Sequence, residues 1–290
     1  MDTITQAIIK TLIYADLFAW PLTESELYTK LQSKKIINKP AFAKKLQTAL
    51  KNKYINFSKG FYFLPKKNKL VSKRLTAKPI YAQKLEKAQK LSHLLQFCPG
   101  VLAICLTGSM AVGNVKKDDD LDFLIITKPN QLWLARFLVL GMAQLLGVRR
   151  KPHDHTVTDK LCLNIFLEEG YLLIPQKIQN LFTAHELVQL QVLAGPEFFY
   201  QKIICSNPWI KQYLANAFYI CQKKPETGKT YSSNIWTLIN KISYQFQMWY
   251  MRSKQTRELI SYHFAFFHPQ DKALEILKRF QTGKKQFGLI

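Results

Sequence analysis

Residues 101–127 read VLAICLTGSMAVGNVKKDDDLDFLIIT, and this stretch decides the fold. It begins with an apolar run of strand length at residues 101–106, breaks at Gly108 and Ser109, and continues as a second apolar run at residues 121–126. Short apolar runs separated by turn residues are typical of buried strands. The stretch therefore predicts two strands at the centre of a sheet, joined by a glycine-serine turn and a polar loop.

Two aspartates stand at the start of the second strand. Asp120 and Asp122 flank Leu121, and side chains two residues apart in a strand project from the same face. Two like charges this close repel each other, and a hard divalent cation that takes carboxylate oxygens relieves the repulsion. The pair therefore predicts a metal site for Mg²⁺ or Mn²⁺ held by Asp120 and Asp122.

The glycine-serine turn suits a phosphate group. Gly108 allows a sharp turn whose bare backbone a phosphate can approach, and Ser109 adds a hydroxyl and a helix N-cap, where anions are favoured. The alternative is a solvated acidic turn at residues 118–120, since charge clusters are common in turns. Asp122 favours the site, because it lies inside an apolar run that a plain turn does not explain.

These residues resemble the signature of the DNA polymerase beta-like nucleotidyltransferase superfamily. GS at 108–109 is followed, after ten residues, by DLDF at 120–123, similar to the family pattern of GS and then D-h-[DE]-h, where h is apolar. The resemblance covers roughly residues 85–170. It implies that Gly108 and Ser109 bind the triphosphate of an NTP, and that Asp120 and Asp122 hold the Mg²⁺ that activates an acceptor hydroxyl.

The sequence departs from that family at the third carboxylate, which a later strand usually supplies. The strand predicted at residues 160–167 has Asn164 at its centre, and an amide can ligate a metal but cannot take a proton at neutral pH. Three explanations stay open. The third acid comes from Glu168, Glu169, Asp154 or Asp159; or two acids suffice, with Asn164 in a supporting, cofactor-binding role; or catalysis is lost and nucleotide binding remains.

Composition sets wider bounds. The chain has 290 residues and a formal charge of +23, from 35 lysines and 7 arginines against 19 acids. Such a surface favours polyanions, although lysine enrichment also follows from an AT-rich genome. The five cysteines show no metal-binding spacing, which fits buried free thiols and a cytoplasmic protein. The longest apolar stretch, residues 132–148, is interrupted by Arg136 and Gln144 and is expected as a buried helix, with no membrane partner.

The N-terminal part resembles a winged helix-turn-helix. Helices are predicted at residues 4–18, from the capping box at Thr23 through Leu31, and at 40–51, followed by a hairpin of residues 54–57 and 61–64. Its lysines would suit phosphate contacts with nucleic acid. The alternative is a module that serves only packing or protein contact.

The rest of the chain is assigned more coarsely. Residues 66–78 are expected as a basic connector and residues 223–229 as a loop. Asn130 is expected to cap the buried helix that follows the second strand. Further helices are expected at residues 79–97, 183–195, 196–222 with a break at 207–208, 234–266 and 269–280. The fold class is mixed α+β. We expect a winged-helix-like domain and connector at 1–78, a nucleotidyltransferase-like core with a small mixed sheet at 79–180, and a helical domain at 181–290.

The predicted function is Mg²⁺-dependent transfer of a nucleoside monophosphate from an NTP to a hydroxyl of an unspecified acceptor. The alternative is a degenerate nucleotidyltransferase fold that binds nucleotide or nucleic acid in a regulatory role. The two differ in whether a third carboxylate joins Asp120 and Asp122.

Overall fold

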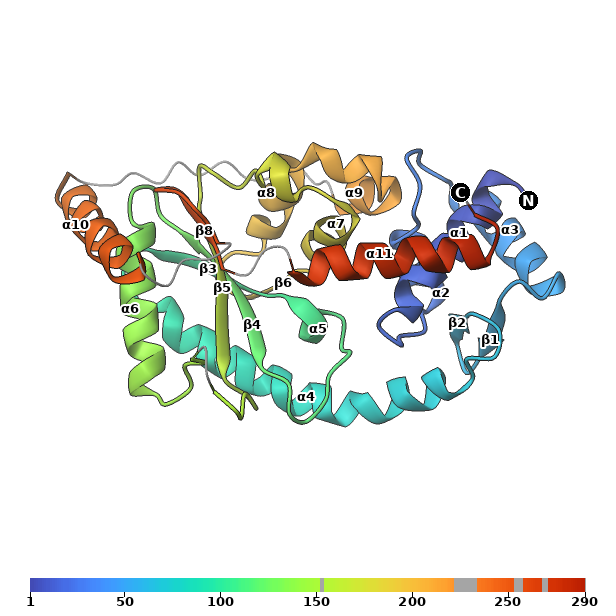
Figure 1. Cartoon of the computed structure of the whole chain (residues 1–290), viewed down its shortest axis with the longest axis horizontal. Helices are drawn as coiled ribbons and strands as arrows, with labels where there is room; N and C mark the ends of the chain where they lie inside the picture. The colour runs from blue at the N-terminus through green and yellow to red at the C-terminus, as the bar shows by residue number, and fades with distance from the viewer. Residues whose placement is uncertain (152–153, 222–233, 253–257, 268–270, 290) are drawn as a thin grey trace.

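The computed structural model describes residues 1–290 except 152–153, 222–233, 253–257, 268–270 and 290. The chain forms a mixed α+β fold around a six-stranded sheet (Figure 1). The helices are α1 (Thr3–Asp16), α2 (Glu24–Thr29), α3 (Lys39–Lys51), α4 (Lys69–Gln96), α5 (Gly108–Ala111), α6 (Leu132–Leu145), α7 (Leu181–Val188), α8 (Phe198–Ser206), α9 (Ala215–Cys221), α10 (Asn234–Met251) and α11 (Asp271–Gln286), with short 3-10 helices η1 (Gln176–Ile178) and η2 (Pro208–Gln212). The strands are β1 (Asn56–Ser58), β2 (Phe61–Phe63), β3 (Val101–Leu106), β4 (Leu121–Thr127), β5 (Leu161–Glu168), β6 (Gln191–Ala194), β7 (Leu259–Ile260) and β8 (Phe264–Phe266).

The large sheet has the strand order β6-β3-β4-β5-β8-β7. β4 and β5 are parallel, and the other neighbouring pairs are antiparallel. Leu106 at the end of β3 pairs with Phe123, and Asp122 pairs with Cys162 near the start of β5. The end of β3 and the starts of β4 and β5 therefore meet at one edge of the sheet, which is where the glycine-serine turn and the two aspartates lie.

Both faces of the sheet are buried, which explains why its central strands are mostly apolar, with Asp122 in β4 and Asn164 in β5 as polar exceptions. Ala103 and Cys105 of β3 pack into the hydrophobic cluster that includes α1 and α7, whereas Ile104 and Leu106 pack into the cluster beneath α4 and α6. Figure 1 shows α4 crossing below the sheet, with α7, α8 and α9 on its opposite side. Within the described ranges, no helix combines the length and the apolar character that a membrane span requires.

The N-terminal helices and hairpin lie where the sequence predicts them. The capping box at the start of α2 is present: the Thr23 hydroxyl accepts from the backbone of Glu26, and the Glu26 carboxylate accepts from the backbone of Thr23. Ile8, Leu27 and Phe42 belong to the same hydrophobic cluster as the inner residues of β3 and β4. The N-terminal module, residues 1–65, therefore packs directly on the core, and its interpretation as a winged helix that binds nucleic acid stays a prediction.

The expected connector at residues 66–78 is wrong. α4 runs without a break from Lys69 to Gln96, with Pro79 inside it. Proline costs stability in a helix interior because it removes one backbone donor. The helix forms nevertheless because Val71 and Ala77 on its first turns are buried.

Asn130 is also not the cap of α6, since the cap position is Gln131.

Two predicted helices of the C-terminal part contain strands. Residues 191–194 form β6, which pairs with β3, and the helix expected to reach residue 266 ends at Met251. Phe264–Phe266 instead forms β8, which pairs with β5 and carries β7 on its outer edge. The break at residues 207–208 is confirmed, and α11 extends past its predicted end at 280. The loop predicted at 223–229 lies outside the described residues.

Candidate functional site

The glycine-serine turn is fixed to the start of β4. The backbone N–H of Thr107 donates to the carbonyl of Asp122 at 2.9 Å, and the Thr107 hydroxyl donates to the same oxygen at 3.3 Å. Gly108 has φ of +66°, a region that favours glycine, and a Cβ built there would lie 2.6 Å from Oδ2 of Asp122. The turn and the aspartate are thus in close contact, as the sequence pattern predicts, and any side chain at position 108 would push them apart.

Ser109 does not cap the helix that follows. The N-cap of α5 is Thr107, and Ser109 lies in the first turn, exposed to the cleft that contains the acids. The loop beyond it is tied to the N-terminal module, because the side-chain amide of Asn114 donates to the carbonyl of Phe18 at 2.9 Å. The Ser109 hydroxyl therefore remains on the cleft surface beside Gly108.

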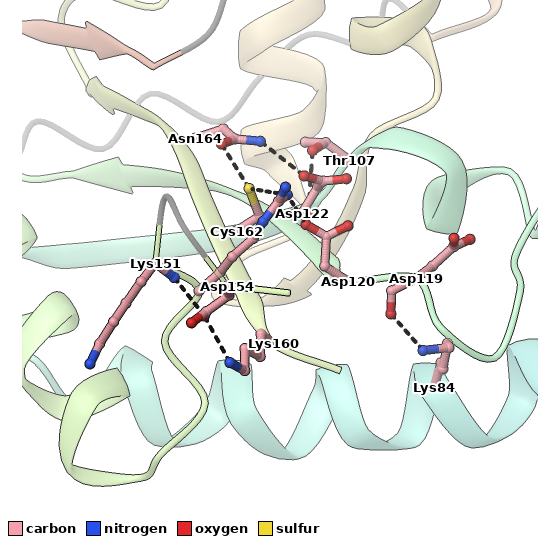
Figure 2. A network of polar contacts seen from close by, with 11 residues as sticks. Lys84, Thr107, Asp119, Asp120, Asp122, Lys151, Asp154, Lys160, Cys162 and Asn164 are labelled. Carbon is pink, nitrogen blue, oxygen red and sulfur yellow. Dashed lines mark hydrogen bonds and ion pairs between the residues drawn. The ribbon is translucent and has the colours of Figure 1, made fainter. Parts of the chain in front are cut away.

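Asp120 and Asp122 converge with a residue of β5 (Figure 2). One ligand atom each from Asp120, Asp122 and Cys162 lies within 4.8 Å of the others. The side-chain amide of Asn164 donates to Oδ1 of Asp122 at 2.9 Å, and the Cys162 thiol donates to Oδ1 of Asn164 at the same distance. Asn164 therefore orients the Asp122 carboxylate from the central position of β5.

Burial and the neighbouring charge of Asp120 raise the pKa of Asp122 to about 6. Asp120 itself forms an ion pair with Arg150, whose guanidinium also contacts the Cys162 sulfur at 3.4 Å. Burial, Asp122 and Asp120 raise the pKa of the Cys162 thiol to about 12, so this thiol stays protonated. The two carboxylates fit a hard divalent cation, whereas a protonated thiol does not suit Mg²⁺. Of these three residues, the two aspartates could therefore hold such a cation.

The four acids considered for the third position point elsewhere. Figure 2 shows Asp154 turned toward Lys160, away from the aspartate pair. The contacts are Glu168 with the backbone of Asn130 and with His263 at 2.6 and 2.8 Å, Glu169 with Lys202 at 2.6 Å, Asp154 with Lys160 at 2.7 Å, and Asp159 with Lys84 at 2.6 Å. None of the four belongs to the group that Asp120 and Asp122 form with Cys162, so the structure does not bring any of them to the aspartates and that explanation of the missing acid is wrong.

A carboxylate that the sequence pattern did not indicate comes from α7. Oε2 of Glu186 accepts from the backbone N–H of Gly108 at 3.3 Å, and burial together with Asp122 raises the pKa of Glu186 to about 7. Position 186 resembles the end of a capping box, but α7 begins earlier, with Asn180 as its N-cap. The sequence feature that could have indicated Glu186 is its position as an acid in an apolar helix, between His185 and Leu187, which are both buried.

The glycine-serine turn, the two aspartates, Asn164 and Glu186 line one cleft with a volume of about 1160 Å³. The N-terminal module contributes Trp20 and Lys30 to its wall, and α11 contributes Lys272. Lys272 lies close enough to lower the pKa of both Asp122 and Glu186, although burial raises the pKa of each of them more strongly. The cleft therefore combines an acidic cluster with lysines from the two ends of the chain.

A small mixed sheet that brings a glycine-serine turn against paired aspartates is the arrangement expected of a nucleotide-transferring domain. Residues 86–179 match the family model described as Nucleotidyltransferase domain, and this part of the chain is accordingly a nucleotidyltransferase domain. The match supports nucleotidyl transfer as the general function.

No curated protein matches the chain. Among solved structures, "Crystal structure of the toxin-antitoxin with AMP-PNP" is similar at 12% identity and a TM-score of 0.25, over 58% of this chain and 93% of that chain.

Proposed function

We propose that the protein transfers a nucleoside monophosphate from an NTP to a hydroxyl group of an acceptor, with Mg²⁺ or Mn²⁺ held by Asp120 and Asp122. The observation that carries the proposal is the contact between the Asp122 carboxylate and the Gly108 turn, with Asp120 beside it. A phosphate at the turn would lie next to the aspartates, which is the arrangement that metal-assisted phosphoryl transfer needs.

The reaction requires one bond to form and one to break at the α-phosphorus. The acceptor oxygen bonds to phosphorus, the bond to the bridging oxygen breaks, and pyrophosphate leaves. When bound, the metal ion makes the hydroxyl more acidic and offsets the charge that develops on the leaving phosphates. Gly108 and Ser109 orient the phosphates, and Asn164 orients Asp122. Because Asn164 cannot take the hydroxyl proton, a carboxylate of the cluster accepts it.

The test is transfer of label from each of the four α-labelled NTPs, with Mg²⁺ or Mn²⁺, to acceptors in a cell lysate. We expect wild-type protein to transfer label from at least one NTP, and Asp122→Asn to lose about a hundredfold or more of that rate because it loses a metal ligand. Asp118→Asn is the matched control, since Asp118 is exposed in the same loop. Equal transfer by Asp122→Asn and Asp118→Asn would refute the proposal.

A second candidate is a nucleotide-binding domain without transfer activity. Two observations favour it: Asn164 stands where the family usually has a carboxylate, and Arg150 already neutralises Asp120. This candidate predicts NTP binding that depends on Gly108 while label transfer stays at background. Nucleotide binding and label transfer, measured on the same samples, separate the two candidates.

Nucleic acid is a proposed partner of the N-terminal module. Lys39, Lys44, Lys51 and Lys53 are exposed on α3 and just after it. Lysines placed in this way would bind phosphates without reading sequence. The proposal predicts binding to mixed DNA or RNA that weakens steeply with salt, and loss of that binding when all four lysines become glutamine.

A further inference from the structure

Lys30 brings a positive charge from the N-terminal module into the nucleotidyltransferase cleft. It is the C-cap residue of α2, and it lines the cleft that also contains Gly108 and Ser109. In the part of the chain that the structure describes, its ammonium group has no hydrogen bond and no ion pair within 4.0 Å. Burial lowers the pKa of Lys30 although Glu26 and Glu186 attract its charge.

The two acids near Lys30 are engaged elsewhere. Both carboxylate oxygens of Glu26 bond to Arg74, at 2.8 and 2.7 Å, and one of them also accepts from the backbone of Thr23. Glu186 accepts from the Gly108 backbone. The Lys30 side chain is half-buried, and its ammonium group lines the cleft without a bonded counter-charge among the described residues, so it can bind an anion that enters the cleft.

Two further polar groups in the cleft that contains Lys30 have unsatisfied hydrogen-bonding atoms. Nε1 of Trp20 and Nε2 of His185 are buried and have no hydrogen-bond partner among the residues that the structure describes, and both residues line the same cleft. Trp20 has one side covered by Arg74, which lies 4.7 Å from its ring centroid, and His185 stacks on Tyr14 with ring centroids 4.0 Å apart. An indole N–H and an ammonium group only donate hydrogen bonds, so this wall fits a ligand rich in acceptor oxygens.

We propose that Lys30 binds the phosphate chain of the nucleotide, so that the N-terminal module forms one wall of the nucleotide site. This inference rests on the proposed function, because the nucleotide is its ligand. Lysine suits the task, since its ammonium is a compact charge with three donors that can follow a flexible phosphate chain. The N-terminal module then has a role in substrate binding, whether or not it also contacts nucleic acid.

The test measures Kd for the four Mg-NTPs and for inorganic tripolyphosphate on the full chain, together with the thermal midpoint without ligand. The variants are Lys30→Met, Lys30→Gln and Lys30→Arg, with Lys34→Met as the matched control, since Lys34 is exposed on the same module. We expect Lys30→Met and Lys30→Gln to weaken both NTP and tripolyphosphate by about tenfold or more, because a charge-assisted hydrogen bond is lost. Lys30→Arg should retain most of the affinity, and Lys34→Met all of it.

The thermal midpoint distinguishes phosphate binding from a structural role, because loss of a structurally important lysine would lower the midpoint. Lys30 is half-buried and its ammonium group bonds no described residue, so replacing it with methionine removes a partial desolvation cost and no bonded contact, and the midpoint of Lys30→Met should stay equal or rise. Unchanged Kd values for Lys30→Met, or weaker NTP binding with unchanged tripolyphosphate binding, would overturn the inference and leave the proposed function standing. Absence of any NTP binding by the wild-type protein would overturn both.

Discussion

Oδ2 of Asp122 occupies the space that a Cβ atom at Gly108 would need, at 2.6 Å from its position. This contact joins the two halves of the sequence pattern, because the turn and the acid come from different strands that meet at one edge of the sheet. Glycine is required at position 108 both for its φ of +66° and for this close approach.

Replacing Gly108 with alanine should therefore displace Asp122. Gly113 offers a matched control, since its φ is also positive, at +75°, but a Cβ there would meet its nearest neighbour, Trp20, at an ordinary 3.8 Å. Both variants should lose about 1 kcal/mol of unfolding free energy from backbone strain. Only Gly108→Ala should also lower label transfer or NTP binding, by about tenfold or more, because small displacements at a reacting centre are costly. Equal effects of the two variants on NTP binding would contradict the account.

Asp122 should make the protein less stable as pH rises. Its folded-state pKa of about 6 lies above its ordinary value of 3.8, so the folded state holds a proton that the unfolded state releases between these values. Below about pH 4, wild type and Asp122→Asn should have similar charge at position 122. Above pH 6 the wild type ionises a buried carboxyl beside Asp120, and Asp122→Asn should be more stable by about 3 kcal/mol.

Denaturant unfolding at pH 4.5 and pH 8, without divalent cations, checks this prediction. The stability difference between Asp122→Asn and wild type should grow in favour of the variant from the lower to the higher pH. Asp118→Asn should show no such growth, because Asp118 is exposed. A variant that loses stability at pH 8 would show that the Asp122 carboxylate is stabilised rather than strained by its surroundings.

Arg150 competes with a metal ion for Asp120. Its guanidinium forms an ion pair with Asp120 at the mouth of the acidic cluster. Removing this positive charge should tighten Mn²⁺ binding severalfold in the absence of nucleotide, because like charges near a partly exposed site repel by about 1 kcal/mol. Electron paramagnetic resonance titration of free Mn²⁺ measures the effect in Arg150→Met. Arg149→Met is the control, since Arg149 lines the cleft without an ion pair among the described residues.

Pro79 should cost the fold some stability. It lies well inside α4, where proline removes a backbone hydrogen bond. We expect Pro79→Ala to raise the unfolding free energy by about 1 to 3 kcal/mol. Lys78→Ala, one residue earlier in the same helix, should change it by much less. A loss of stability in Pro79→Ala would indicate that the chain needs the proline to set the path of α4.

The sequence predicts the centre of the fold well because that part follows local rules. The strands at 101–106 and 121–127 combine apolar runs with clear turn residues, and the α2 capping box is visible in the residues themselves. The failures have tertiary causes. β8 is only three residues long, and Phe264–Phe266 is a strand because β5 offers it an open edge. Periodicity cannot reveal such a partner.

The site was predicted in part for the same reason. Gly108 follows the end of β3, and Asp120 and Asp122 lie at the start of the adjacent strand β4, so their spacing in sequence reflects how these two strands pair. Glu186 and Lys30 reach the cleft from α7 and α2, and nothing in their local sequence indicates the packing that brings them there. The sequence accordingly predicts a third acid near β5, where the carboxylates have other partners.

The most direct test of the central claim is a crystal structure of the protein with Mn²⁺ and a non-hydrolysable NTP, recorded with the anomalous signal of manganese. The account predicts an anomalous peak bridging the carboxylates of Asp120 and Asp122, with the phosphate chain at Gly108 and Ser109. A nucleotide bound outside this cleft, or a nucleotide in the cleft with manganese away from both aspartates, would contradict it.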